Sequence, residues 1–434
     1  MPPQPPTGPG LSADLSFRGV VHQSSAPELD ALLDGGRLTV YSGFDPTAPS
    51  LHVGNLLQLV TLRRLQEAGH RPIALLGGAT GLIGDPGGKA TERPLLSEDE
   101  HRENVAGIQP QLERFLDFSP GAGPARAVLR DNAQWLAPLG IVTFLRDVGK
   151  HFSVNQMIAK ESVRARIERP DRGISYTEFS YMLLQAYDFL HLYDTDGCRM
   201  QIGGSDQWGN ITMGIDLVRR CRNVEVFGLT TPLLTRSDGA KLGKTETGTV
   251  WLDAARTSPY ALFQYFLNAE DARVGAYLRL LTFVPHERIT ELDCTTEDAP
   301  EKREAQRELA RAVCLIVHGA AETARAERAA GALFSEEIAG LDEKTLVEVL
   351  ADAPTTALAR SAVDGGLTVV DALVTTGLAP SKGAARRTVD QGGAYVNNRR
   401  VADPNQTIGA GDLLADRYLV LRRGRKEYHL LQFG

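Results

Sequence analysis

Little in this 434-residue sequence favours secretion, a disulfide framework or a membrane span. Its four cysteines, Cys198, Cys221, Cys294 and Cys314, form no CxxC pair and no framework-like spacing. No apolar run approaches the ~18 residues that a membrane-spanning helix requires. The first ten residues are rich in proline and contain neither a basic nor an apolar signal region. We therefore expect a reduced, cytoplasmic protein that contacts no membrane.

Several signatures of catalytic and cofactor sites are also missing. There is no GxGxxG fingerprint, which argues against a dehydrogenase, and no GxSxG elbow for a serine nucleophile. The nine histidines show no HExxH spacing and no cluster with cysteine, so a structural zinc site is not expected. A Walker A loop is excluded at both glycine-rich stretches. Ala90 replaces the Ser or Thr required after Lys89, and Gly239 stands one residue too near Gly243.

The composition is that of a globular protein, with 42% hydrophobic and 23% charged residues. A chain of this length has a prior of two or three domains. Its net charge of −7 argues against a protein covered in nucleic acid, and no DNA partner is expected. Residues 367–434 differ, because ten Lys and Arg oppose six Asp and Glu there. This basic block suits a local contact with RNA.

The first secondary-structure elements predict a parallel sheet. Residues 38–41 form a short apolar run typical of a buried strand, and apolar residues in 56–65 recur at helical spacing on one face. Gly69 and Pro72 end that helix, and residues 73–76 form the next apolar run. A strand, a helix and a strand in this order make a βαβ unit. We therefore expect an α/β fold with a crevice at the carboxyl edge of a parallel sheet.

Shifts in composition and pattern divide the rest of the chain. Helical and strand-like segments continue to about residue 235, and an Ala-rich, acidic, helical pattern follows from about residue 260 to 350. The expected segments are a disordered tail (1–14), an α/β domain (15–235), a loop (236–255), a helical domain (256–352), a linker (353–366) and a small basic α+β module (367–434).

A loop rich in glycine and proline, residues 41–55, follows the first predicted strand and leads into a helix. The backbone N–H groups and the dipole of a helix N-terminus favour phosphate at such a place. His52 can donate to a phosphate oxygen, and Gly54 leaves room for a flat base near the backbone. The alternative is an ordinary turn with a capping histidine.

A second loop, residues 236–245, carries Lys241 and Lys244 with Gly243 between them. Two lysines on a glycine-containing loop suit a segment that closes on a polyphosphate. The alternative is a solvated basic turn.

Tyr181, Gln185 and Asp188 lie at i, i+4 and i+7, on one face of the predicted helix 179–190. Their neighbours are strongly apolar, so we expect this face to be at least partly buried. An unpaired buried polar group costs roughly 1–3 kcal/mol, and a carboxylate costs more. The three side chains therefore require either a polar ligand, which we favour, or a closed internal hydrogen-bond network.

Paired glycines, Gly203 and Gly204, lie within a polar stretch at residues 201–210. They permit close approach of the backbone to a sugar or a base. The alternative is an ordinary glycine turn beside a core tryptophan, Trp208.

Taken in order, these segments resemble the bacterial tyrosyl-tRNA synthetases, a family of class I aminoacyl-tRNA synthetases. Each motif is modest, but five of them in the family's order are specific, and the resemblance extends from about residue 15 to the end of the chain. Residues 367–434 are similar to a small RNA-binding module shared with a ribosomal protein and some pseudouridine synthases. The five segments are residues 41–55, 84–89, 181–188, 201–210 and 241–245.

The resemblance implies a Rossmann-like parallel-sheet catalytic domain, an α-helical tRNA-binding domain and a small α+β RNA-binding module. It implies that L-tyrosine is activated with ATP to tyrosyl-adenylate, with release of pyrophosphate. Tyrosine would then be transferred to the 3′-terminal adenosine of tRNA(Tyr) for protein synthesis. ATP would be bound with Mg²⁺, and the enzyme would be a homodimer.

Residues 46–55 correspond to the family's HIGH signature, and residues 241–245 to its KMSKS signature on a mobile loop. Asn55 stands where the second histidine of HIGH is usual, and Leu242-Gly243 replaces Met-Ser. By resemblance, the residues that act on the ATP phosphates are Thr47, His52, Lys241, Lys244 and Thr245. The residues that bind tyrosine are Tyr41, Asp85, Tyr181, Gln185, Asp188 and Gln207, with Tyr41 and Asp188 on its hydroxyl. The remaining ATP contacts are Gly43, Asp45, Gly54, Asn55, Gly203 and Asp206.

Three other functions are compatible with parts of the sequence. A class I synthetase for tryptophan would lack the pairing of Tyr41 with Asp188. A nucleotidyltransferase with a small acceptor would not need a basic RNA-binding block. A non-catalytic RNA-binding descendant of a synthetase usually loses signature residues, whereas His52, Lys241 and Lys244 are present here.

Overall fold

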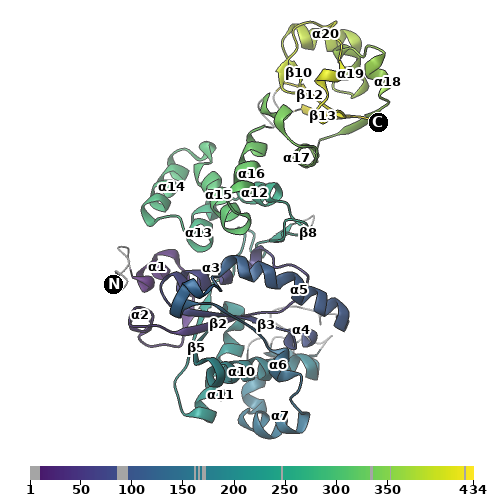
Figure 1. The fold of residues 1–434 in the computed structure, drawn as a ribbon. Coiled ribbons are helices and arrows are strands. Elements are labelled where there is room, and N and C mark those ends of the chain that lie inside the picture. The colour runs from purple at the N-terminus through teal and green to yellow at the C-terminus, as the bar shows by residue number, and fades with distance from the viewer. Residues whose placement is uncertain are drawn as a thin grey trace. The chain divides into compact units, whose positions relative to one another are not determined.

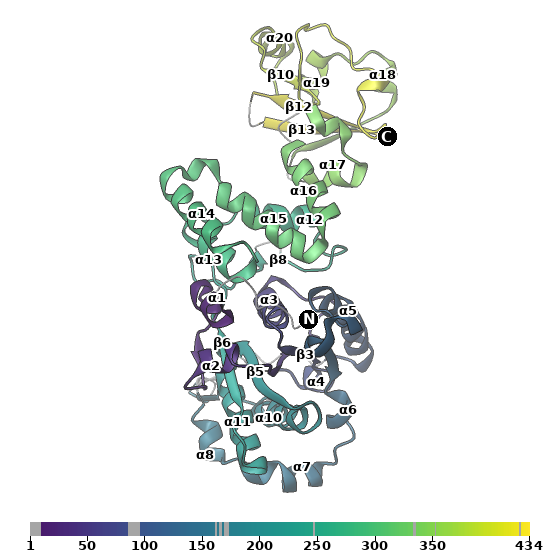
Figure 2. The same ribbon diagram turned by 60° about the vertical axis from the view of Figure 1, so that its left-hand side comes forward.

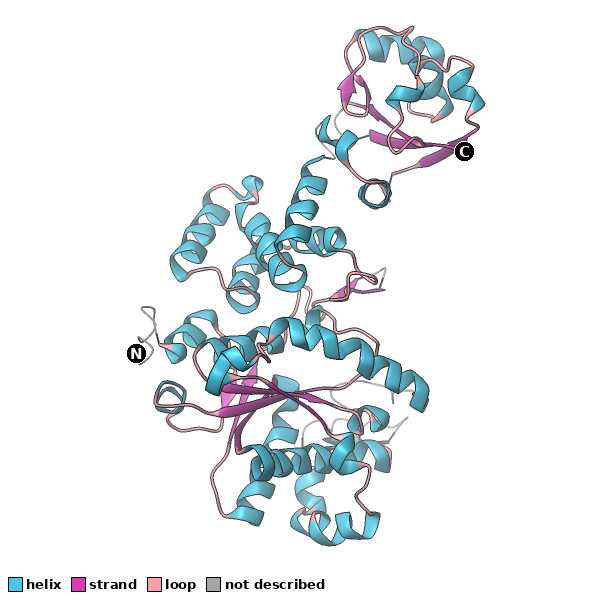
Figure 3. Ribbon diagram, in the orientation of Figure 1, coloured by secondary structure: helices cyan, strands magenta, loops and turns pink. Residues whose placement is uncertain are grey.

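The computed structural model contains two compact units. The first comprises residues 1–257 and 268–317, and the second comprises residues 258–267 and 318–434. The described residues are 10–85, 96–160, 163–164, 167–168, 173–245, 248–332, 336–351, 353–424 and 427–434, without the side chains of 244, 245, 336 and 337. Helices and strands are mixed throughout (Figures 1 and 3), which confirms the predicted α/β class.

The first unit is built on a six-stranded sheet with the order β1-β6-β5-β2-β3-β4. All neighbouring strands are parallel except β1, which is antiparallel to β6. From β2 the chain proceeds through β3 to β4 on one side, and β5 and β6 are added on the other. Such a reversal of strand order opens a crevice at the carboxyl ends of the strands. The strands are β1 (Gln23–Ser24), β2 (Thr39–Phe44), β3 (Arg71–Leu76), β4 (Val128–Asp131), β5 (Cys198–Gly204) and β6 (Phe227–Thr231).

Helices cover both faces of this sheet. The helices α3 and α5 lie on one face, and α10 and α11 lie on the other (Figures 1 and 2). The predicted βαβ unit is confirmed as β2, α3 and β3, and its helical leucines are buried. The helices of this unit are α1 (Leu11–Arg18), α2 (Leu29–Asp34), α3 (Val53–Glu67), α4 (Thr80–Ile83), α5 (Glu98–Phe115), α6 (Ala133–Leu136), α7 (Ile141–Asp147), α8 (Val154–Ile158), α10 (Tyr176–Asp196), α11 (Trp208–Arg222), α13 (Asp271–Leu281), α14 (His286–Asp298) and α15 (Glu304–His318).

The second unit contains a five-stranded sheet with the order β11-β10-β12-β13-β9. Its core includes Val369 and Leu373 of α19 and Leu419 and Leu421 of β12. The strands are β9 (Thr355–Leu358), β10 (Ala394–Val396), β11 (Arg399–Arg400), β12 (Tyr418–Arg423) and β13 (Glu427–Phe433). The helices are α12 (Pro259–Leu267), α16 (Ala320–Ala332), α17 (Glu343–Val349), α18 (Ser361–Asp364), α19 (Val369–Thr375) and α20 (Lys382–Asp390).

Three expected segments differ from the structure. The expected tail 1–14 includes the start of α1 at Leu11, where Ser12 N donates to Asp34 Oδ1 at 3.1 Å. The expected linker 353–366 contains β9, which pairs in parallel with β13 and so extends the sheet. The helices expected as one domain over 256–352 are divided between the two units, since α13 to α15 belong to the first unit.

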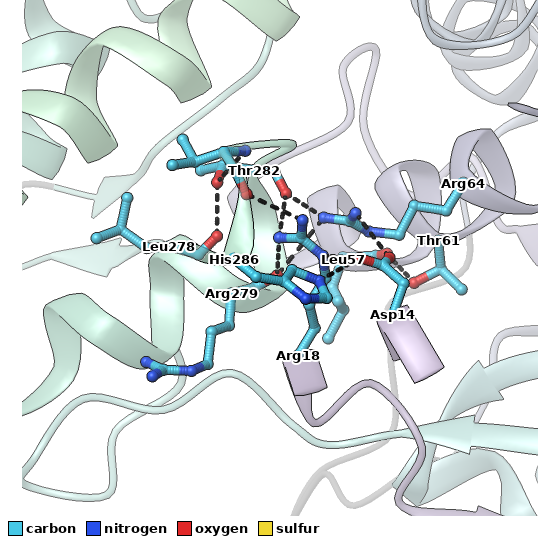
Figure 4. A network of polar contacts seen from close by, with 10 residues as sticks. Asp14, Arg18, Leu57, Thr61, Arg64, Leu278, Arg279, Thr282 and His286 are labelled. Carbon is cyan, nitrogen blue, oxygen red and sulfur yellow. Dashed lines mark hydrogen bonds and ion pairs between the residues drawn. The ribbon is translucent and has the colours of Figure 1, made fainter. Parts of the chain in front are cut away.

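A buried ionic network within the first unit joins α1, α3 and the segment after α13 (Figure 4). Asp14 accepts from Arg18 Nε at 2.7 Å and from His286 Nε2 at 2.7 Å, and Arg64 approaches its other oxygen at 3.3 Å. Both guanidinium groups also donate to the carbonyl oxygen of Thr282. Burial and, to a lesser extent, the nearby charge of Arg18 together lower the pKa of Arg64 to about 9.

Asp14 is the counter-ion on which this network depends. Burial raises the pKa of its carboxyl, but hydrogen bonds from Arg18 and His286 outweigh that effect and leave the pKa below its ordinary value. The stability that Asp14 contributes is therefore present at neutral pH and is lost as the pH falls through this lowered pKa.

The substitution Asp14→Asn is expected to lower the free energy of unfolding at pH 7 by about 2–3 kcal/mol, because two buried guanidinium groups lose their counter-charge. Urea unfolding measures this change. Glu67→Gln is the control, since it breaks the exposed Arg63–Glu67 pair and should cost less than about 1 kcal/mol. Equal costs for the two variants would contradict the dependence on Asp14.

Candidate active site

The predicted site residues of the first unit gather where the parallel strands end. The loops that follow β2, β3 and β5 carry residues 45–52, 77–85 and 205–207, and α10 passes below them with its own polar face. This helix begins after Ser175, whose side chain accepts from Glu178 N, and it ends at Gly197 in a left-handed conformation. These caps set the register in which Tyr181, Gln185 and Asp188 share one face.

Asp188 is a buried carboxylate with two donors. The residue is only 2% exposed. Its carboxylate accepts from Trp135 Nε1 at 2.8 Å and from Asn132 Nδ2 at 3.0 Å. Burial raises the pKa of Asp188 to about 7, against the lowering effect of these two hydrogen bonds.

Tyr41 lies beside this carboxylate on β2. It is 1% exposed, and its hydroxyl has no hydrogen-bond partner in the described part of the chain. Burial raises the pKa of Tyr41 well above its ordinary value, and the charge of Asp188 adds to the effect. An unpaired buried hydroxyl costs about 1–3 kcal/mol. The pair therefore offers a polar group of a ligand both an acceptor and an unused hydroxyl.

Gln201 carries a second unpaired buried group. It stands opposite Tyr41 in the register of β5 and β2, so the two side chains lie on the same face of the sheet. Its amide oxygen has no hydrogen-bond partner among the described residues. From the sequence, Gln201 was placed in the polar segment 201–210 but was assigned no role in binding.

A chain of amide hydrogen bonds continues from α10 to the loop after β3. Gln185 accepts from Asn210 at 2.9 Å and donates to Gln207 at 3.3 Å. Gln207 in turn donates to Asp85 at 2.6 Å. The structure thus brings together three predicted tyrosine-binding residues from three separate segments, and Asn210 with them. Residues 86–89 of the predicted segment 84–89 lie outside the described residues.

Asp45, which was predicted to contact ATP, lies with these residues. It accepts from the Tyr181 hydroxyl at 2.8 Å and from Thr80 Oγ1 at 2.8 Å. Thr80 also accepts from Asn132, one of the two donors to Asp188. Asn132, Trp135 and Thr80 were missed from the sequence, because a polar residue after a strand is common and nothing in their spacing relates them to Asp188.

His52 caps α3, and its neighbours explain two features of the signature. Asn55 Oδ1 accepts from the His52 backbone N–H at 3.0 Å, so an amide serves at the position of the usual histidine. A Cβ atom at Gly54 would approach His52 Cε1 to 2.8 Å. A side chain at position 54 would therefore displace the ring of His52 from this position. Thr47 and Gly43 are both exposed at the same strand end.

The second signature segment packs against the first. Val53 N donates to Val250 O at 3.0 Å, and the rings of His52 and Trp251 lie 6.3 Å apart. The Lys241 ammonium lies 3.7 Å from Asp206 Oδ2, next to Gly203 and Gly204 at the end of β5. For Lys244 and Thr245 the structure describes only the backbone, which forms β7 (Lys244–Thr245) opposite β8 (Gly248–Thr249).

Comparison with known proteins identifies the family. The model for class I tRNA synthetases (W and Y) matches residues 33–335, and the model for the SYY-like C-terminal domain of tyrosine–tRNA ligase matches residues 345–431. A tyrosine–tRNA ligase of Roseiflexus castenholzii is 51% identical over 96% of this chain and 98% of that protein. One from Bacillus caldotenax is 50% identical over 98% and 100%. This chain belongs to the tyrosyl-tRNA synthetases, the tyrosine–tRNA ligases that charge tRNA(Tyr) for translation.

Solved structures agree with this identification. A C-terminally truncated mitochondrial tyrosyl-tRNA synthetase of Coccidioides posadasii is 31% identical, with a TM-score of 0.65, over 74% of this chain and 92% of that one. A tryptophanyl-tRNA synthetase of Encephalitozoon cuniculi, at 12% identity and a TM-score of 0.53, shares the fold alone. The synthetase is thus a class I enzyme of the tyrosine branch.

The described residues contain no group of three or more His, Cys, Asp or Glu that could hold a metal ion. No helix within the described ranges is both long and apolar enough to cross a membrane.

The raised pKa of Asp188 predicts a pH-dependent cost of keeping this carboxylate ionised. In the unfolded chain the carboxyl ionises near its ordinary pKa of ~3.9, whereas in the fold it ionises at about 7. Between pH 5 and pH 8 the wild type should therefore lose about 3 kcal/mol of unfolding free energy relative to Asp188→Asn. Urea unfolding without substrates at both pH values measures the difference. Asp99→Asn is the control, because Asp99 is an exposed carboxylate at the start of α5. An equal pH response in the two variants would refute the raised pKa of Asp188.

Proposed function

We propose that the synthetase binds the phenol of tyrosine between Tyr41 and Asp188. The observation that carries this proposal is the buried Tyr41 hydroxyl, which lacks a partner among the described residues and lies beside a carboxylate. A phenol can donate to Asp188 and accept from Tyr41, which satisfies all three groups. We assign the substrate ammonium to Asp85, Tyr181, Gln185 and Gln207, where carboxylate and amide oxygens concentrate.

We assign ATP to the ends of β2 and β5. Asp206 and Gly203 would contact the ribose, and His52, Lys241 and Lys244 would contact the phosphates. The pairing of Lys241 with Asp206 supports this placement, because it puts a cation beside the proposed ribose position before ATP binds. Mg²⁺ enters as part of the MgATP substrate, held by phosphate oxygens and water.

The two steps then follow from positioning and charge. The carboxylate oxygen of tyrosine attacks the α-phosphorus of ATP, the bond to the β-phosphate oxygen breaks, and pyrophosphate leaves. That carboxylate is ionised at pH 7, so no general base is required. His52, Lys241 and Lys244 neutralise the charge that develops on the phosphates. A ribose hydroxyl of the terminal adenosine of tRNA then attacks the tyrosyl carbonyl, and AMP leaves.

Amino-acid-dependent exchange of labelled pyrophosphate into ATP tests this assignment without tRNA. Exchange is expected with tyrosine and not with phenylalanine or tryptophan. An amino acid without the hydroxyl leaves the buried polar groups of Asp188 and Tyr41 unpaired, which disfavours its binding; tyrosyl-tRNA synthetases are the usual illustration of this selectivity. In Asp188→Asn the preference for tyrosine over phenylalanine should fall at least about tenfold, since an amide accepts less strongly.

Two results would contradict the pocket assignment. One is an unchanged preference for tyrosine in Asp188→Asn. The other is an equal loss of preference in Asp216→Asn, the matched control on the outer part of α11. Exchange with another amino acid in place of tyrosine would discard Asp188 as the phenol ligand.

We propose that the enzyme is a homodimer joined through α7 and α8. Phe144 and Val148 anchor α7 in the core, while Val142 on the same helix is 74% exposed. Large exposed apolar patches mark interaction surfaces, and a second copy of this chain offers a matching apolar face. The exposed apolar residues of α7 and α8 are Ile141, Val142, Leu145, Val154 and Ile158.

The substitution Val142→Asp should convert the dimer to a monomer, because each copy would bring a carboxylate into an apolar interface. Sedimentation equilibrium measures the mass. Leu315→Asp is the matched control, since Leu315 is an exposed leucine on α15, outside this face. A monomeric wild type, or a Val142→Asp variant that stays dimeric, would refute the interface.

We also propose that the second unit contacts tRNA, and that the enzyme acts in the cytoplasm, where translation takes place. The support is chemical: residues 367–434 are basic, and Arg386, Arg387, Arg399 and Arg400 are exposed on α20 and β11. Exposed arginines of this kind pair with phosphate.

A further inference from the structure

One face of α5 carries three buried polar side chains that belong to none of the signatures. His101, Asn104 and Gln111 are each 6% exposed. Their spacing of i, i+3 and i+10 places them along one side of the helix. Because buried polar groups are costly unless they are hydrogen-bonded, such a face requires defined partners. All three side chains have hydrogen-bond partners in the backbone of the loops that follow β2 and β3.

Gln111 holds the two residues that precede His52. Its Oε1 accepts from Leu51 N at 3.0 Å and from Ser50 Oγ at 3.2 Å. Ser50 Oγ in turn accepts from Asp253 N at 3.2 Å, in the chain that returns from the second signature. Gln111 therefore lies where both signature segments are anchored.

Asn104 holds the other end of the same loop. Its Nδ2 donates to Pro46 O at 3.0 Å, one residue before Thr47. Between the two anchors, α5 approaches so closely that a Cβ atom at Gly107 would collide with the carbonyl oxygen of Pro49. The loop is thus bound to α5 on both sides of Thr47 and directly before His52.

His101 extends this support to the next loop. Its Nε2 lies 2.7 Å from Gly78 O, directly after β3. Gly78 precedes Ala79, whose N–H donates to Asn132 Oδ1 at 2.8 Å. The buried face of α5 therefore touches the loops on both sides of the proposed substrate position.

We propose that Asn104 and Gln111 are positioning residues for adenylation, which hold the loop 45–52 so that Thr47 and His52 meet the ATP phosphates. Neither touches a substrate. The inference rests on the proposed function, since it is there that the loop is assigned to ATP. Catalysis by preorganised donors requires that their backbone stay fixed when ATP binds, and displacement of about 1 Å is enough to cost up to ~10²-fold in rate.

The variant Gln111→Met tests this inference, because methionine fills the space and removes the acceptor. In tyrosine-dependent pyrophosphate exchange we expect kcat to fall about 10–100-fold and the KM for ATP to rise. The Kd of tyrosine, measured by equilibrium dialysis without ATP, should stay within about twofold. Gln109→Met is the matched control, since Gln109 is an exposed glutamine of the same helix and bonds only Glu113 among the contacts described.

A double-mutant cycle separates positioning from a general structural role. If Gln111 acts through His52, Gln111→Met should cost much less in a His52→Ala background than in the wild type. Equal costs in both backgrounds, or a parallel loss of tyrosine affinity, would overturn the inference. Asn104→Ala, made in the same two backgrounds, provides the same test should Gln111→Met fail to fold.

The same cycle distinguishes failure of this inference from failure of the proposed function. If His52→Ala leaves the exchange rate unchanged, the assignment of the loop to ATP is wrong, and the inference falls with it. If His52→Ala slows exchange while Gln111→Met and Asn104→Ala keep wild-type ATP parameters, the assignment stands and only the role of α5 is overturned.

Discussion

The proposed tyrosine site depends on one buried carboxylate, that of Asp188. A charged group 2% exposed is unfavourable unless it is hydrogen-bonded, and Trp135 and Asn132 supply the two donors. Asn132 also holds Thr80 and the N–H of Ala79, so the stabilisation of one charge fixes the loops after β3 and β4 relative to α10. Trp135 and Asn132 donate to Asp188, whereas the neighbouring Tyr41 hydroxyl has no hydrogen-bond partner among the described residues.

A backbone hydrogen bond holds the segment of the first signature against the chain that follows the second. His52 and Trp251 are about two hundred residues apart in the chain, yet Val53 N and Val250 O are hydrogen-bonded. Near this contact the second signature reads Leu242-Gly243 in place of Met-Ser. Leu242 is buried, and Gly243 adopts a positive φ of 85° close to Val53. Asn55, which replaces the usual second histidine, also makes a contact with the backbone. Its amide oxygen accepts from His52 N and so caps the start of α3.

Much of the fold was predictable because its signals are local. The periodic apolar residues of α3, the apolar runs of β2 and β3, and the polar face of α10 each depend on side chains close in sequence. The division of the helical stretch was not predictable in this way, because α12 and α13 are both amphipathic and no residue in either specifies its unit. Nor was the role of Asn132, whose partner Asp188 is 56 residues away.

By itself, the sequence determined the α/β class, the βαβ start, the family and the residue types that the chemistry requires, because motifs in a fixed order and local periodicity are properties of the chain. Only the tertiary structure decided which polar groups are satisfied. It paired Asp188 with Asn132 and Trp135, left Tyr41 and Gln201 without partners among the described residues, and set the buried face of α5 against the loop before His52. The physical reason is that hydrogen bonds and burial depend on distance in space, which residues far apart in sequence acquire only when the sheet and its helices pack together.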